Sequence, residues 1–418
     1  MISRWARIEK FLNYLLIFLL PTQLALHFWP PSAFVFGLRV DYLAPAIYLT
    51  DILFLAVLVP WVCKNHKKFS SDLKKHKLYI FVFIVFVVAN TAFSISIFPS
   101  VFKWLKVVEL VMFYYYVSVR NDIFKDRKVL PVIFYSLLFF SLIGIIQFLL
   151  GKTLGGPLYI LGERNFNIST PGIALAQLVG INFMRAYSTF SHPNSFAGFL
   201  GVGILFLVFN YSWKDSSRKI FGLLIIFLAF VLTFSTAAFL GMLACLVVFW
   251  IWRKKIFNSK NVVFLTGVFL MISLIQPFFA SVILKNNFNL TQNISQRFEL
   301  ALGAGRVISQ KFFLGEGLNT FIVGESKITQ LGFYLWILQP VHNFFLLIFS
   351  ETGIFGLLIV FWIITGMFRK TLATKNIAIF MCLVFVLTTG LFDHYWFTLQ
   401  QNTLLFAFIL GDSIRGRS

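Results

Sequence analysis

Residues 339–358 read QPVHNFFLLIFSETGIFGLL, a largely apolar stretch that opens on a histidine and an asparagine. A helix that crosses a bilayer needs roughly 20 predominantly apolar residues, and the run from Phe344 to about residue 367 is long enough. Pro340 suits the approach to a helix start. A titratable, hydrogen-bonding side chain is costly at the edge of hydrocarbon. The stretch therefore predicts a membrane helix, and His342 at its start needs a reason to be there.

The composition of the whole chain agrees with a membrane protein. Of the 418 residues, 59% are hydrophobic and only 12% are charged, whereas a soluble globular domain carries about 25% charged residues. The three cysteines, Cys63, Cys245 and Cys382, lie far apart in or beside apolar runs and show no metal-ligand spacing. They are interpreted as buried apolar thiols, and the chain as an integral membrane protein.

Twelve apolar segments are candidate membrane spans. They are residues 11–28, 45–63, 78–97, 101–119, 129–150, 194–211, 219–235, 236–252, 262–284, 343–367, 376–392 and 398–412. The apolar run 219–252 is long enough for two helices, and we divide it at Ser235-Thr236 because polar residues interrupt it there. The segment 101–119 is the next weakest, since it contains Lys103, Lys106 and Glu109.

The distribution of basic residues supports this map. With the N-terminus in the cytoplasm, the cytoplasmic loops and tails hold 25 of the 36 Lys and Arg residues, as the positive-inside rule requires. The net charge of +21 is therefore a topology signal spread over short loops, and we expect no nucleic-acid partner. We predict an all-α polytopic membrane helix bundle over residues 1–418, a single domain of about 12 transmembrane helices with both termini cytoplasmic.

Two long segments remain for the outer face, 151–193 and 285–342. We expect the second to be partly helical and both to form the active-site face. Basic residues here oppose the general trend, so Arg185, Arg297 and Arg306 are informative. Guanidinium groups bind phosphate through a bidentate fork and stay charged. Alternatively, each arginine reaches lipid headgroups or pairs with a local acid.

Arg297 and Arg306 are nine residues apart, which places them on opposite sides of a helix. A kink at Gly303 or Gly305 would be needed to aim both of them inward.

Several other polar residues are site candidates. His342 suits a general base, because a neutral imidazole can remove a proton from an attacking hydroxyl; the competing interpretation is a helix cap. The neighbouring Asn343 is predicted to be a helix cap. For His192 with Asn194, and for Asp393-His394, helix capping or interhelical hydrogen bonding is favoured, although polar groups at membrane depth still count as site candidates. Glu351 lies inside its helix and needs a partner there.

Three ordered segments carry a resemblance to a known family. RAYSTFSHPNSFAGFL (185–200) has an arginine, then Thr-Phe, then His-Pro-Asn leading into a helix. RFELALGAGRVISQKFFLGEGLNTF (297–321) has an arginine followed by a Gly-x-Gly turn, and VHNFFLLIFSETGIFGLL (341–358) has a His-Asn helix start. In their order, their spacing and the span count, the chain resembles the O-antigen ligase and O-antigen polymerase superfamily of bacterial envelope enzymes.

The resemblance implies a multi-pass protein of the bacterial inner membrane with its active site on the outer face. It implies an inverting glycosyltransferase that needs no metal or cofactor. Its donor would be a glycan on a polyprenyl-diphosphate lipid, and its acceptor a glycan or a lipid A core. Carried over by motif, His342 matches the histidine that activates the acceptor hydroxyl, while Arg297 and Arg185 match arginines that hold the diphosphate.

The chain departs from the family at one place. Members often show Ser-Arg near the middle turn, where this chain reads Ser235-Thr236. Arg306 or Lys311 is the expected replacement. Together with His192, Asn194 and Glu351, these two complete the predicted substrate- and diphosphate-binding residues.

Ligase, polymerase and transfer of oligosaccharide to a protein share this chemistry and differ in the acceptor. The competing class is a flippase or transporter of lipid-linked sugars. A flippase is expected to carry ionisable groups near mid-membrane on many helices, and often internal symmetry. Here the candidate groups gather on one face and no repeat is visible, which favours the enzyme.

Overall fold

The computed structural model describes residues 4–124, 128–211, 217–254, 259–285, 292–328 and 338–413, and most of these are helical. The helices are α1 (Arg4–Phe18), α2 (Leu49–Lys64), α3 (His66–Lys75), α4 (Lys77–Ala92), α5 (Ile97–Val119), α6 (Asn121–Phe124), α7 (Val129–Leu150), α8 (Pro193–Asn210), α9 (Ser217–Leu232), α10 (Thr236–Arg253), α11 (Ser259–Lys285), α12 (Gln292–Gln310), α13 (Phe321–Ile328), α14 (Phe344–Ala373), α15 (Ile377–Gly390), α16 (Tyr395–Thr398) and α17 (Gln400–Ser413). The chain therefore has the mainly helical fold that its apolar segments predict.

Short strands occur only in pairs within the described residues. They are β1 (Ala25–His27), β2 (Phe34–Val35), β3 (Leu38–Arg39), β4 (Ala46–Tyr48), β5 (Leu175–Leu178) and β6 (Ile181–Met184). β1 pairs antiparallel with β4, β2 with β3, and β5 with β6. The first two pairs form a small layer between α1 and α2, which becomes one wall of the candidate site.

Each of the twelve predicted spans overlaps at least one helix, but their boundaries differ. Among the described residues, five helices are long and apolar enough to cross a membrane, α7, α8, α10, α11 and α14, or six if the bent pair α2–α3 counts as one span. The predicted segment 11–28 is too long, because α1 ends at Phe18 and residues 25–27 form β1. Pro21 follows the helix end closely, where it prevents continuation. The number of spans and the side of each terminus stay predictions.

The predicted division at Ser235-Thr236 is confirmed. α9 ends at Leu232, and α10 begins at Thr236 with Ser235 at its N-cap. Phe234 between them has a φ of 48°, a left-handed conformation that no continuous helix contains.

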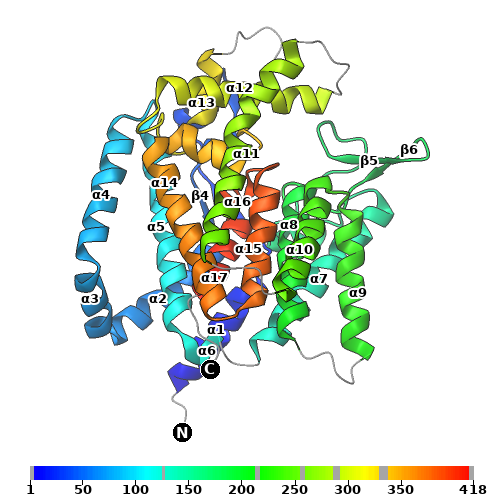
Figure 1. Cartoon of the computed structure of the whole chain (residues 1–418). Helices are drawn as coiled ribbons and strands as arrows, with labels where there is room; N and C mark the ends of the chain where they lie inside the picture. Colours follow the sequence, from blue (N-terminus) through cyan, green and yellow to red (C-terminus); the bar gives the residue numbers. More distant parts are fainter. Residues whose placement is uncertain are drawn as a thin grey trace.

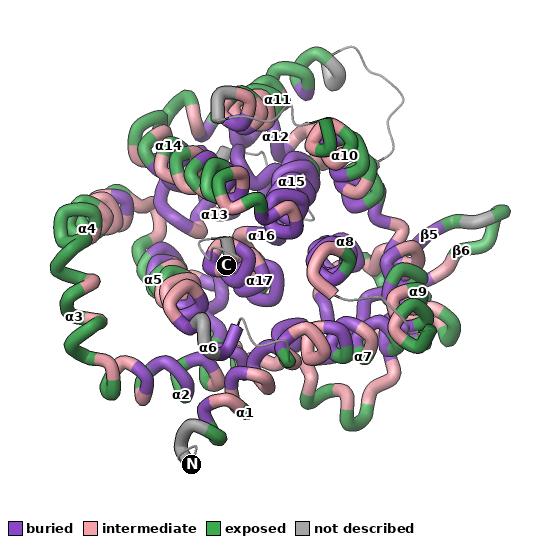
Figure 2. Tube along the Cα trace, turned by 60° about the horizontal axis from the view of Figure 1, so that its bottom comes forward, coloured by how far each residue is buried: buried purple, intermediate pink, exposed green. Residues whose placement is uncertain are grey.

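The centre of the bundle consists of α8, α15 and α17, whose residues are mostly buried (Figure 2). Gly201 on α8 and Gly241 on α10 leave space for the ring of Phe385 on α15, which a Cβ at either glycine would meet. At the rim, many residues of α4 and α9 are exposed (Figure 2), and large apolar side chains are among them. Contiguous exposed apolar surface of this kind fits contact with lipid.

α14 is kinked at Gly353, whose φ of 67° and ψ of −170° are open only to glycine. The loop before α13 packs on this kink. The N–H of Glu316 donates to Ser350 O at 3.0 Å, and the N–H of Gly317 donates to Glu351 O at 3.1 Å. Carbonyls that the kink removes from the helix are thereby satisfied. The Gly-x-Gly turn and the kinked helix therefore form one unit.

Both termini lie at the same end of the bundle, and α12 and α13 lie at the other end (Figure 1). The β5–β6 hairpin also lies away from the termini (Figure 1). Residues from the segments 151–193 and 285–342 thus gather at the end far from the termini.

Candidate active site

A cavity of about 270 Å³ lies where α14 begins and where the turn after α15 leads into α16. Its walls come from the β1–β4 layer, from α5, from the start of α8, and from α16 and α17. The histidines His192, His342 and His394 all line it, together with Asp393. Chain segments far apart in sequence therefore bring the titratable groups of three predicted polar positions into one space.

His342 is not the cap of α14. Asn343 is the N-cap, and its side-chain oxygen accepts hydrogen bonds from the N–H groups of Phe345 at 2.9 Å and Leu346 at 3.0 Å. The same side chain donates to Leu391 O at 3.2 Å, which ties the helix start to the end of α15. Asn343 therefore has the capping role predicted for it, and His342 is left free for another.

His342 lines the cavity, and one nitrogen of its imidazole, the buried Nδ1, has no hydrogen-bond partner among the described residues. The ring lies 5.3 Å from that of His394, measured between centroids. A buried polar atom without a partner is costly, so a ligand or a bound water that reaches Nδ1 would remove this penalty.

Asp393 is a buried acid of the cavity wall. One carboxylate oxygen accepts a hydrogen bond from the side chain of Asn194 at 3.0 Å, and the other accepts from the N–H of His394 at 2.8 Å. The Nδ1 of His394 lies 2.7 Å from the hydroxyl of Thr398, one turn further on. Interhelical hydrogen bonding, predicted for Asp393-His394, is therefore present, and it positions a carboxylate among the histidines.

Arg185, Asn194 and His192 form a polar unit at the start of α8. Arg185 donates to the side-chain oxygen of Asn194 at 2.7 Å and also to the carbonyl of Thr233. His192 is the N-cap of α8, and its Nδ1 accepts from the N–H of Asn194 at 3.2 Å. His192 lines the cavity, while Arg185 reaches Asp393 through Asn194. The capping role predicted for His192 with Asn194 is therefore present. Asn194 also links the guanidinium of Arg185 to the carboxylate of Asp393.

Burial controls the charge states of the cavity. It lowers the pKa of His342 to about 3, and that of His192 and His394 to about 4, although Asp393 acts in the opposite direction on all three. Burial alone would raise the pKa of Asp393, but the histidines and Arg297 hold it below its usual range. At pH 7 the cavity therefore holds neutral imidazoles around one carboxylate.

Arg185 remains a cation in this environment. Burial lowers its pKa to about 10, which is still far above neutral pH.

The structure brings only some of the predicted binding residues to this region. Arg297, at the start of α12, donates to Phe392 O at 3.3 Å, directly beside the Asp393 turn. Arg306 and Lys311 are exposed and do not line the cavity. α12 runs as one helix from Gln292 to Gln310, without the kink that would aim Arg306 inward.

Glu351 lies behind the cavity, and its partner is the backbone of the preceding loop. Its carboxylate accepts a hydrogen bond from the N–H of Phe321, the first residue of α13, at 3.3 Å. This contact satisfies one of the free N–H groups at a helix start. Glu351 thus connects the kink of α14 to α13.

Some cavity residues were missed by the sequence reading. Tyr42 lies edge-on to His394 with a centroid distance of 5.5 Å, and Lys103, Lys106 and Gln400 also line the cavity. A signal was available for the lysines, because two cations three residues apart in an apolar segment share one helix face. Tyr42 lies in a short 3-10 turn, Asp41–Leu43, between β3 and β4, where no periodic pattern marks it.

Within the described residues, no three His, Cys, Asp or Glu side chains are placed to hold a metal ion.

Comparison with known families agrees with the motifs. A family model described as O-antigen ligase matches residues 221–361, from α9 into α14, and so includes Arg297 and His342. No curated protein sequence matches the chain. The predicted resemblance to the O-antigen ligase superfamily is confirmed by this match.

Proposed function

Because residues 221–361 match the O-antigen ligase family, we propose that this multi-pass membrane protein is a glycosyltransferase that uses a lipid-linked donor. It moves a glycan from a polyprenyl-diphosphate carrier to an acceptor hydroxyl at the outer face of the bacterial inner membrane. The acceptor is a lipid A core in a ligase or a growing glycan in a polymerase. The observation that supports this most directly is His342 in the wall of a polar cavity, with a buried Nδ1 that has no hydrogen-bond partner among the described residues.

The reaction requires one proton transfer and one displacement. The acceptor O–H gives its proton to the imidazole of His342, and the oxygen forms a bond to the anomeric carbon of the donor sugar. The bond from that carbon to the diphosphate oxygen breaks, and its electron pair leaves with the diphosphate. Attack from the side opposite the leaving group inverts the configuration at the anomeric carbon.

The surrounding charges fit these steps. A diphosphate near His342 raises the affinity of the imidazole for a proton, because an opposite charge favours the protonated form. Asp393 acts in the same direction from inside the cavity. Arg297 and Arg185 supply fixed positive charge near the Asp393 turn, which stabilises negative charge as it develops on the leaving group.

Replacement of His342 tests the proposal. For His342→Ala we expect loss of glycan transfer by about 100-fold or more, because a general base contributes roughly 10²–10⁴-fold. The measurement is transfer from a polyprenyl-diphosphate glycan to an added acceptor by purified protein in lipid nanodiscs, in buffer with EDTA. Unchanged transfer by the variant would contradict the role of His342.

The same assay separates the alternatives. Transfer to a lipid A core identifies a ligase, extension of the glycan identifies a polymerase, and labelled protein identifies a protein transferase. If the wild-type protein moves the donor between the leaflets of a vesicle but transfers no glycan, the result supports the flippase instead.

His66→Ala is a suitable control variant, since this histidine lies on exposed α3 at the far side of α2 from the cavity. Transfer by this control should equal that of the wild type.

A further inference from the structure

The cavity wall contributed by α5 and the neighbouring loops carries three cations among the described residues, Lys103, Lys106 and Arg164. Their partners differ. Arg164 pairs with Asp41 at 3.5 Å in an exposed position. The two lysines lie three residues apart on α5, so they present their side chains on the same helix face.

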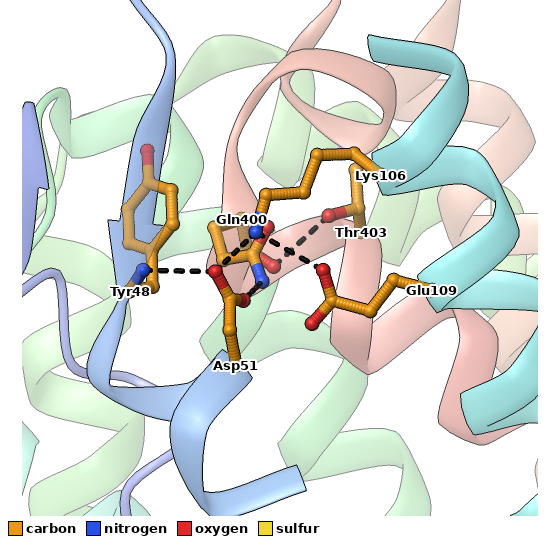
Figure 3. Close-up of polar contacts among 6 residues, drawn as sticks. All are labelled: Tyr48, Asp51, Lys106, Glu109, Gln400 and Thr403. Atoms are coloured by element: carbon orange, nitrogen blue, oxygen red, sulfur yellow. Dashed lines mark hydrogen bonds and ion pairs between the residues drawn. The ribbon is translucent and has the colours of Figure 1, made fainter. Parts of the chain in front are cut away.

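The positive charge of Lys106 is compensated by carboxylates. Figure 3 shows its ammonium between two carboxylates, those of Asp51 and of Glu109, the latter at 3.0 Å. Asp51 also accepts a hydrogen bond from Gln400 at 2.5 Å and one from the N–H of Tyr48 at 2.8 Å. This network joins α2, α5 and α17. Two carboxylates surround the one ammonium, so Lys106 has no positive charge left for a ligand, and the network has a structural role in holding the wall together.

Lys103 has no ion pair of this kind, although the carboxylate of Glu351 attracts it electrostatically from beyond ion-pair distance. Its ammonium donates to the carbonyl of Phe397 at 2.8 Å and lies 5.3 Å from the centre of that residue's ring. No carboxylate forms an ion pair with Lys103 in the part of the chain that the structure describes. An ammonium has three donors, and a carbonyl uses one of them. Two donors and a full charge thus remain at the cavity wall.

The position of Lys103 relates it to the histidines. Phe397 belongs to α16, the short helix that follows His394 directly, and the N–H of Phe397 donates to His394 O at 2.9 Å. The lysine is therefore held to the same turn of chain that presents His394 and Asp393 to the cavity.

We propose that Lys103 is an anion-binding residue of this cavity. Its ligand is an anionic oxygen, either of the donor diphosphate or of an acidic group on the acceptor glycan. An unpaired cation away from bulk water is costly, and a bound anion offsets that cost. The identity of the substrate rests on the proposed function. The affinity for an anion rests on the Lys103 ammonium, which has no ion pair among the described residues.

A binding measurement tests the site independently of catalysis. Purified full-length protein in nanodiscs is titrated with farnesyl diphosphate, and separately with glucuronate as the acidic sugar, while heat denaturation is followed. The amide of Lys103→Gln can still donate to Phe397 O. We expect its Kd for the anion to rise about tenfold or more, because removing one partner of a charge pair weakens binding strongly. Lys103→Arg should restore most of the binding.

Lys370→Gln is the matched control, because Lys370 is exposed in the last turn of α14 and lies outside the cavity. Its Kd for the anion should equal that of the wild type. The inactive variant His342→Ala should still bind, so that a failure of transfer and a failure of anion binding remain distinguishable.

The ligand that responds identifies the source of the anion. A weakened Kd for farnesyl diphosphate assigns Lys103 to the donor, and a weakened Kd for glucuronate alone assigns it to the acceptor. Equal binding of both anions by wild type and Lys103→Gln, or no binding of either by the wild type, would overturn the proposal.

Discussion

At the scale of single residues, we expect Asp393 to influence how well His342 acts as the proposed base. Burial lowers the pKa of His342, and the nearby carboxylate acts against that effect. Asp393 is held in place by Asn194 and by its own backbone turn. Each pKa unit corresponds to about 1.4 kcal/mol of proton affinity. The charge of Asp393 is therefore expected to set the rate of the proton transfer.

For Asp393→Asn we expect a fall in kcat of roughly tenfold or more, because the imidazole loses the charge that stabilises its protonated form. KM for the donor should change less than kcat, and the rate should fall across the whole range from pH 6 to pH 8, where His342 is neutral in both proteins. The control is Asp41→Asn, a second acid of the cavity wall that is largely exposed and pairs with Arg164. A normal kcat for Asp393→Asn would remove Asp393 from the mechanism.

The charge states also give a pH dependence of stability. A histidine whose pKa is lowered by folding binds fewer protons in the folded state, so the unfolded state gains protons first as the pH falls. His192, His342 and His394 all have lowered pKa values, at about 4, 3 and 4. Their contribution to stability is present above about pH 6.5, the ordinary value, and is lost as the pH falls toward 4.

We therefore expect the melting temperature to fall between pH 7 and pH 4.5, and to fall less for His192→Asn, which keeps a capping side chain but does not titrate. The measurement is the unfolding temperature in detergent at a series of pH values. An identical pH dependence in wild type and variant would show that His192 does not contribute. Ser195→Ala, which changes a buried side chain of the same helix that does not titrate, serves as the reference for general destabilisation.

At the scale of elements, the kink of α14 and the loop of residues 312–318 stabilise each other. Ile354 donates to Phe312 O at 2.8 Å, and a Cβ at Gly353 would collide with the carbonyl of Phe313. Asn90 on α4 connects the two, since its amide donates to Leu314 O at 2.7 Å and to Glu351 O at 2.9 Å. Here the second and third motifs of the sequence come together in space.

Gly353→Ala should lower the free energy of unfolding by at least about 2 kcal/mol, because the backbone conformation excludes a side chain and the added Cβ has no room. Gly366→Ala is the matched control in the same helix. Nothing lies near a Cβ at Gly366, and alanine in a helix interior is favoured over glycine by about 0.5–1 kcal/mol. Thermal unfolding in detergent measures both. Equal stability of the two variants would show that the kink is not required.

At the scale of the whole molecule, the bundle is polarised. α14 begins and α15 ends beside the cavity, so the turn between them lies at the opposite end of both helices. The termini lie at that opposite end as well (Figure 1). The positive-inside rule predicts that the termini and this turn are cytoplasmic, and on that prediction we propose that the cavity lies on the outer face.

Cysteine labelling tests this orientation. In a background with Cys63, Cys245 and Cys382 replaced, an impermeant thiol reagent added to intact spheroplasts should label Ser169→Cys, in the segment 151–193. Lys375→Cys, in the turn between α14 and α15, should be labelled only after the membrane is opened. Both positions are exposed. The reverse pattern would place the cavity in the cytoplasm.

The sequence by itself was sufficient for the features that depend on local composition. The membrane character, the location of twelve helices, the break at Ser235 and the resemblance carried by the three motifs all follow from which residues are neighbours along the chain. Apolar length and interrupting polar residues are local properties, and a helix forms all its backbone hydrogen bonds within its own segment. The role of Asn343 as a cap was predicted for the same reason.

Only the tertiary structure decided what the cavity contains. His192, His342 and Asp393-His394 come from the ends of different helices, and which ends meet depends on packing between segments more than 40 residues apart. The same packing turned Arg306 and Lys311 outward, left Glu351 to the loop before α13, and gave Lys106 two carboxylates but Lys103 none. Charge compensation is a property of pairs in space, so no local pattern distinguishes two lysines one turn apart.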